Sequence, residues 1–119
     1  MMENTYTGTM QPLDAKEWAA ITLTAAANGD IAAADFDCAD DTLQRECCEA
    51  LCGVLVDKPI CDVMQMNNNA VYYNVEHDLP RDRLYLASIA VQAAKKAALA
   101  YLNENGIPYE GEGICDCLK

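Results

Sequence analysis

The stretch that decides the fold of this chain runs from Pro80 to Asn105 and reads PRDRLYLASIAVQAAKKAALAYLNEN. Pro80 suits the first position of a helix, because its missing N–H would have no partner there. Gly106 and Pro108 follow the stretch, and glycine and proline at these positions are typical of a helix end. Strong helix formers fill the interval, with no internal glycine or proline. The stretch therefore predicts one long C-terminal helix.

This helix is apolar around most of its circumference. Between Leu84 and Leu102 only four side chains are polar when tyrosine is counted as apolar. Such a helix is buried on most sides, and a chain of 119 residues has little other material to cover it. One interpretation packs the helix on its own domain and on a second copy of the chain, and the other wraps it within one monomer. The interface expected between copies consists of Ala87, Ala90, Ala94, Ala97 and Tyr101.

Length and composition indicate one domain without a membrane span. An apolar fraction of 52% is enough for a core, and no run reaches the roughly 18 apolar residues of a membrane span. The polar N-terminus lacks the basic and apolar segments of a signal peptide, so a cytoplasmic location is expected. We expect a flexible lead or edge strand over residues 1–12, a globular domain over 13–108, and an acidic tail with glycine and cysteine over 109–119.

The first third of the chain suggests a helix and then gives no clear signal. Asp14 and Glu17 resemble a capping box, and Asn28-Gly29 is typical of a helix end. Trp18, near the start of this expected helix, is interpreted as a core anchor. Residues 30–40 contain spaced aspartates, but they lack the glycine and the closing glutamate of a calcium loop.

The middle of the chain predicts another helix and a hairpin. Asp41 can cap a helix that ends near Val56, with Gln44 three residues after the cap. Segments 60–66 and 70–77 then resemble two strands around three asparagines, which tolerate the backbone of tight turns. The expected fold class is therefore α+β: a small, mostly helical single domain with three helices, one β-hairpin and a long C-terminal helix.

Negative charge is concentrated in one part of the chain. The net charge is −11, and residues 30–62 hold nine acidic side chains against two basic ones. A protein this acidic is repelled by nucleic acid and by anionic membranes, so a basic protein surface is the expected partner. The alternative is that the acidic stretch only keeps an alanine-rich protein soluble. The candidate partner-binding residues are Asp35, Asp37, Asp40, Asp41, Glu46 and Glu49.

Cysteine and histidine give little sign of catalysis. The seven cysteines are an odd number and are expected to be thiols. Zinc sites use two pairs of ligands spaced two to four residues apart, and Cys115 and Cys117 are closer together than that. Nothing in the sequence places a cysteine beside the single histidine, His77, and there is no glycine-rich phosphate loop. We expect no enzymatic activity, no cofactor and no metal.

Two functions remain as hypotheses. The first is a small acidic protein that engages a basic surface of a partner protein, as an inhibitor or a nucleic-acid mimic does. Such proteins are common in phages and other mobile elements. The second is an oligomeric scaffold that binds a small anionic ligand near the hairpin and the start of the long helix, through Tyr72, Tyr73, Arg81 and Arg83. The salt dependence of binding distinguishes the two hypotheses, because only binding through an extended charged surface should weaken strongly as ionic strength rises.

Overall fold

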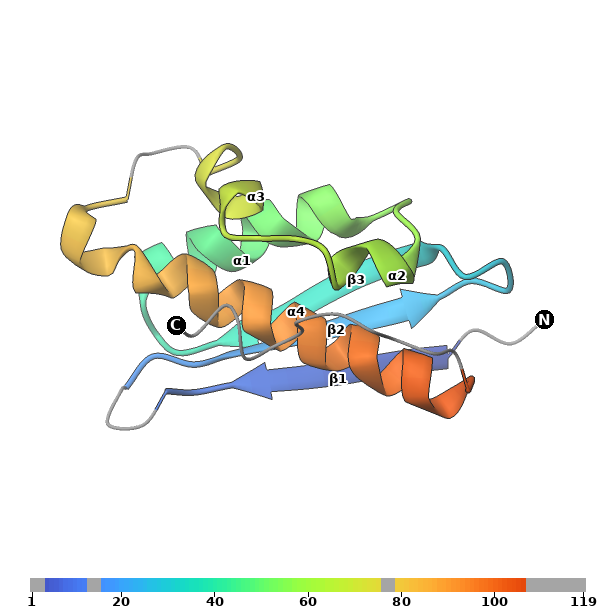
Figure 1. The fold of residues 1–119 in the computed structure, drawn as a ribbon. Helices are drawn as coiled ribbons and strands as arrows, with labels where there is room; N and C mark the ends of the chain where they lie inside the picture. Colours follow the sequence, from blue (N-terminus) through green and yellow to red (C-terminus); the bar gives the residue numbers. More distant parts are fainter. Residues whose placement is uncertain (1–3, 13–15, 76–78, 107–119) are drawn as a thin grey trace.

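The computed structural model of this chain describes residues 4–12, 16–75 and 79–106. Three strands come first: β1 (Asn4–Met10), β2 (Ala19–Ala25) and β3 (Ile31–Cys38). They are followed by α1 (Thr42–Leu55), α2 (Ile60–Val63), α3 (Asn69–Tyr72), the 3₁₀ turn η1 (Arg81–Arg83) and α4 (Tyr85–Glu104). The fold is α+β with a long C-terminal helix, as the sequence predicts (Figure 1).

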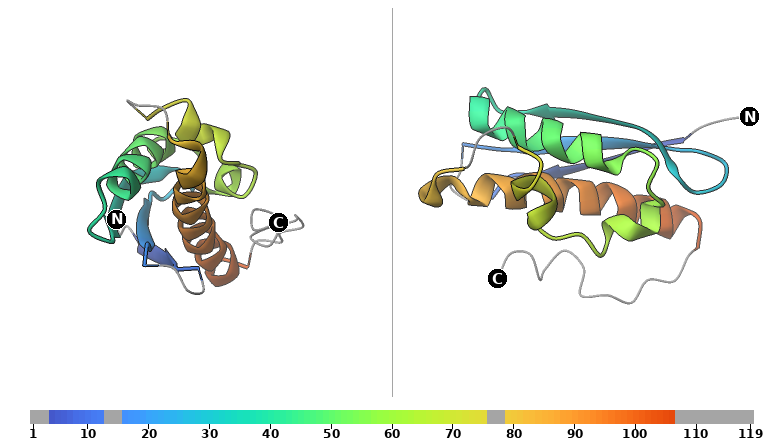
Figure 2. Two further views of the ribbon diagram at one scale, coloured as in Figure 1. Left: turned by 90° about the vertical axis from the view of Figure 1, so that its left-hand side faces the viewer. Right: turned by 90° about the horizontal axis from the view of Figure 1, so that it is seen from above.

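The strands form one antiparallel sheet in the order β1-β2-β3. Helix α4 lies mainly on β1 and β2, and α1 lies mainly on β3 and also contacts α4 (Figures 1 and 2). Both helices cover the face of the sheet that carries the buried side chains of β2. The opposite face carries no helix in the described part of the chain. The molecule is therefore a two-layer structure with one uncovered sheet face.

The helix predicted to begin at Asp14 and end at Asn28-Gly29 is wrong, since β2 occupies the middle of this segment; Asp14 itself lies outside the described residues. Burial alternates along β2, so that Ile21 and Leu23 are buried while Thr22 and Thr24 are only half-buried. This period of two is typical of a strand with one covered face. Asn28-Gly29 belongs to the turn between β2 and β3, where Gly29 has a φ of 90°. The same residue pair serves both helix ends and hairpin turns, which explains the error.

The hairpin predicted over residues 60–77 is also wrong in its described part, residues 60–75. This segment contains the one-turn helices α2 and α3, which bury Ile60, Val63 and Val71. The asparagines start α3 instead of turning a hairpin, and the side-chain oxygen of Asn67 accepts a hydrogen bond from the Asn69 N–H at 2.9 Å. Short helical turns satisfy the backbone locally, whereas two isolated strands would need a further partner.

Three other elements agree with the prediction. Residues 4–10 form an edge strand, one of the two structures that the sequence predicts for the N-terminal segment. Helix α1 begins after Asp41, whose carboxylate accepts a hydrogen bond from the Gln44 N–H at 3.0 Å. Helix α4 is followed by Gly106 with a φ of 65°, which is typical of a C-terminal cap. Its predicted start at Pro80 is corrected, because Pro80 precedes the separate 3₁₀ turn η1 and α4 begins at Tyr85. None of the helices among the described residues combines the length and apolar character that crossing a membrane requires.

Helix α4 approaches β1 most closely at Gly8, where no β1 side chain separates the two backbones. A Cβ atom added to Gly8 would lie 2.1 Å from the carbonyl oxygen of Ala93 and 2.5 Å from the backbone nitrogen of Ala97. The predicted interface between copies must therefore be corrected. Ala87, Ala90, Ala94 and Ala97 are all 0% exposed within a single chain. Tyr101 is half-buried and packs edge-on against Tyr6 with 5.4 Å between ring centroids, so the fold itself covers this surface.

Candidate functional site: the open face of the sheet

The register of the strands defines the composition of the uncovered sheet face. Thr7 pairs with Thr22, which pairs with Asp35, and Ala20 pairs with Asp37 in the next row. Side chains alternate between faces along each strand. The open face therefore consists of Thr5, Thr7, Thr9, Gln11, Trp18, Ala20, Thr22, Thr24, Ala33, Asp35, Asp37 and Ala39.

This face is polar along β1 and acidic along β3. The threonines of β1 are exposed, and the Thr7 and Thr22 hydroxyl oxygens lie 2.8 Å apart in a hydrogen bond. Asp35 and Asp37 are exposed on β3 two residues apart, so their carboxylates lie on the same face. Asp40 follows in the turn before α1 and is also exposed. Three of the six predicted partner-binding residues thus lie on or beside the open face.

Asp41 has a structural role that sets it apart from these aspartates. Its carboxylate caps α1 and also pairs with the guanidinium of Arg83 at 2.6 Å. The Gln44 N–H and then Arg83 lower the pKa of Asp41, because both favour the charged carboxylate. The second carboxylate near this guanidinium is Glu17, at 3.6 Å. Asp41 therefore joins α1 to the start of α4 and is only half-exposed for a partner.

Trp18 lies at the end of the open face and not in the core, which corrects the sequence-based interpretation. The Ala39 N–H donates to the Trp18 carbonyl at 3.1 Å, so the β2–β3 ladder continues through these residues. Strand alternation places Trp18 on the same face as Ala20, while Glu17 reaches Arg83 on the covered side. The indole is half-buried and belongs neither to the described core nor to the side chains packed against it. A period-two analysis of residues 17–25 would have found this position.

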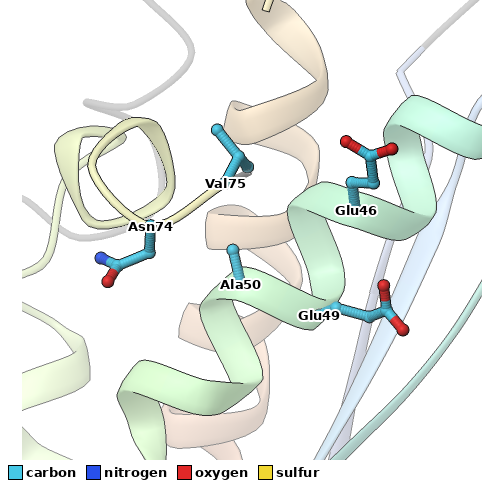
Figure 3. A pocket seen from close by; sticks show the side chains of 5 residues that line it. All are labelled: Glu46, Glu49, Ala50, Asn74 and Val75. Atoms are coloured by element: carbon cyan, nitrogen blue, oxygen red, sulfur yellow. The ribbon is translucent and has the colours of Figure 1, made fainter. Parts of the chain in front are cut away.

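Glu46 and Glu49 lie in a different place from the aspartates of β3. They line a pocket of about 280 Å³ with Ala50, Asn74 and Val75 (Figure 3). This pocket lies between α1 and the segment after α3, on the helical side of the molecule. The six predicted partner-binding residues therefore do not form one surface: Asp35 and Asp37 lie on the open face with Asp40 next along the chain, Asp41 lies at the junction of α1 and α4, and Glu46 and Glu49 line the pocket.

The residues proposed to bind an anionic ligand do not line this pocket. Tyr72 is half-buried, Tyr73 is 80% exposed after α3, and Arg81 is exposed in η1. Arg83 is engaged by Asp41 and Glu17. The acidic lining from α1 would itself repel an anion. Both observations weigh against the hypothesis of a small anionic ligand.

The described thiols are mostly buried and unreactive. Cys38, Cys47, Cys48 and Cys52 are buried, whereas Cys61 is exposed. Burial raises the pKa of Cys47 and of Cys52 to about 12, because a thiolate is poorly solvated there. Within residues 4–12, 16–75 and 79–106, no group of three or more His, Cys, Asp and Glu side chains could hold a metal ion. His77, Cys115 and Cys117 lie outside the described residues.

Comparison with known protein families and with curated proteins finds no match to this chain. Function is therefore inferred from the chain's own residues.

Proposed function

We propose that this chain is a non-enzymatic acidic binding protein that engages a basic surface of a partner protein, as an inhibitor or a nucleic-acid mimic does. The observation that carries the proposal is the pair of exposed carboxylates, Asp35 and Asp37, on an uncovered sheet face. The described residues of that face include no Lys or Arg side chain. Two basic side chains lie near its margin: Lys16 precedes the paired part of β2, and the Lys96 ammonium of α4 donates to the Thr9 carbonyl oxygen of β1 at 3.2 Å.

These carboxylates would act mainly by attracting the partner and by orienting it, not by contributing most of the binding free energy. An exposed ion pair contributes only about 0.2–1 kcal/mol, so a few such pairs do not produce tight binding. A field of one sign instead accelerates encounter and selects the orientation of the partner. Asp37 also accepts a hydrogen bond from the Cys38 N–H at 3.0 Å, which restrains its carboxylate. A cytoplasmic location is part of the proposal, because the described cysteines are free thiols.

The test uses a lysine peptide and two variants of equal charge change. Replacing Asp35, Asp37 and Asp40 by Asn should slow peptide association by about tenfold at low salt and flatten its salt dependence. The matched control replaces Asp57, Asp62 and Asp82, which are exposed but lie off the open face. Stopped-flow association measured from low to high salt compares the two. Equal slowing in both variants would mean that only net charge matters and would contradict the proposal.

A further inference from the structure

Trp18 is half-buried at the end of the open face, so part of its side chain is accessible. Its direct neighbour on the β3 side is Ala39, and the next residue on the same face of β2 is Ala20. Both present only a methyl group, so neither encloses the indole. Asp37 pairs with Ala20 and is therefore the diagonal neighbour of Trp18. Diagonal neighbours on adjacent strands lie within reach of an aromatic side chain.

We infer that Trp18 and Asp37 form the anchor of a docking surface on the open face, and that its occupant is a lysine- or arginine-rich segment of a partner protein. The inference rests on the proposed function and deepens it. An indole is the best aromatic partner for a cation, and a carboxylate beside it pairs with the same ammonium or guanidinium group. Tryptophan is also enriched among the residues that dominate binding, whereas exposed charges contribute mainly at the rim.

Charge selects this occupant over a second copy of the chain. The open face carries Asp35 and Asp37, with Asp40 beside it, so two such faces would bring like charges together. A basic segment instead meets opposite charge along β3 and neutral threonines along β1. Three strands span about 10 Å from the first axis to the third, and the seven residues of β2 extend over about 23 Å. An extended segment of about seven residues would cover this length.

The first experiment uses the fact that Trp18 is the chain's only tryptophan. Its fluorescence should be quenched more strongly by caesium than by iodide, because the nearby carboxylates attract cations and repel anions. Asp37→Asn should reduce this preference, whereas Asp62→Asn, which changes the net charge equally but lies in α2, should leave it unchanged. A Trp18 that neither quencher reaches, or an equal effect of the two variants, would overturn the inference.

The second experiment measures binding of a fluorescein-labelled lysine peptide of about seven residues by anisotropy. Trp18→Ala should weaken binding by about tenfold, and Trp18→Phe should weaken it less, since a phenyl ring still attracts a cation. Tyr73→Ala is the control, because Tyr73 is 80% exposed but lies after α3 on the helical side. Circular dichroism verifies that each variant is folded, and the quenching of the wild-type protein decides the question if Trp18→Ala unfolds.

The outcomes separate this inference from the proposed function. Slower association of the Asp35, Asp37 and Asp40 variant, together with wild-type affinity of Trp18→Ala, would overturn the anchor while leaving the acidic binding surface in place. Unchanged binding in both variants would contradict both. Weaker binding in both, with Tyr73→Ala unchanged, is the result that we expect.

Discussion

Two glycines show how differently the same residue is used in this molecule. Gly8 lies in β1 directly under α4, where an added Cβ would collide with the backbone of Ala93 and Ala97. Gly53 lies in α1 and is exposed, and apart from its chain neighbours and the backbone of its own helix no atom lies within 4 Å of an added Cβ. Gly8 is therefore required for contact between the strand and the helix, whereas Gly53 only weakens its helix.

Substituting alanine at both positions should change stability in opposite directions. Gly8→Ala should destabilise the protein by about 1–3 kcal/mol or more, because backbone atoms of α4 must move to admit the methyl group. Gly53→Ala should stabilise it by about 0.4–1 kcal/mol through lower entropy of the unfolded chain. Urea unfolding measures both free energies. A neutral Gly8→Ala would show that α4 does not lie this close to β1.

At the scale of elements, α1 and α4 are joined at their N-terminal ends by polar contacts. The amide of Gln44, which is 0% exposed, donates to the carbonyl oxygen of Leu86 at 3.0 Å. Asp41 caps α1 and pairs with Arg83 just before α4. A single carboxylate thus stabilises one helix and fixes the start of another.

The cap and the ion pair of Asp41 can be separated by two substitutions. Asp41→Asn keeps an N-cap residue but loses the charge, and should cost less than about 1 kcal/mol at pH 7. Asp41→Ala loses both and should cost about 1–2 kcal/mol. Because folding lowers the pKa of Asp41, the charge stabilises the protein above the ordinary pKa of 3.8 and less as pH falls through the lowered value.

The advantage of the wild type over Asp41→Asn should therefore be constant near neutral pH and vanish in acid. Denaturant unfolding at several pH values measures this difference. Asp40→Asn serves as the control, because Asp40 is exposed and should affect stability by less than about 0.5 kcal/mol. A difference between wild type and Asp41→Asn that persisted at pH well below 3.8 would show that charge is not its source.

The helices could be predicted from sequence more reliably than the strands, for a physical reason. Helices α1 and α4 have clear local sequence signals: the cap residue Asp41 before α1, Gly106 after α4, and long runs of helix-forming residues. Strand β2 depends on two neighbours for its hydrogen bonds, and its many alanines carry little strand signal. Because residues 14–29 are predicted as a helix, Trp18 is assigned to the core and the open sheet face is not predicted.

At the scale of the whole molecule, the sheet divides the protein into two sides with different roles. The helical side buries α4 against the strands and leaves the acidic pocket of α1 at its surface. The other side presents the open face with its aspartates and its tryptophan. One chain therefore buries the long helix without help, and self-association stays a prediction that needs a surface other than the alanines of α4.

A glutamate placed on α4 distinguishes the two ways of covering this helix. Ala94 is 0% exposed within one chain, so Ala94→Glu would bury an unpaired carboxylate or force it out by disrupting the packing. The cost of several kcal/mol is comparable to the total stability of a small domain, about 5–15 kcal/mol. We therefore expect loss of the cooperative thermal transition by circular dichroism, whereas Ala100→Glu, at an exposed position of the same helix, should remain folded. If light scattering showed that Ala94→Glu converts a folded oligomer into a folded monomer, the helix would be covered by a second copy and not by its own sheet.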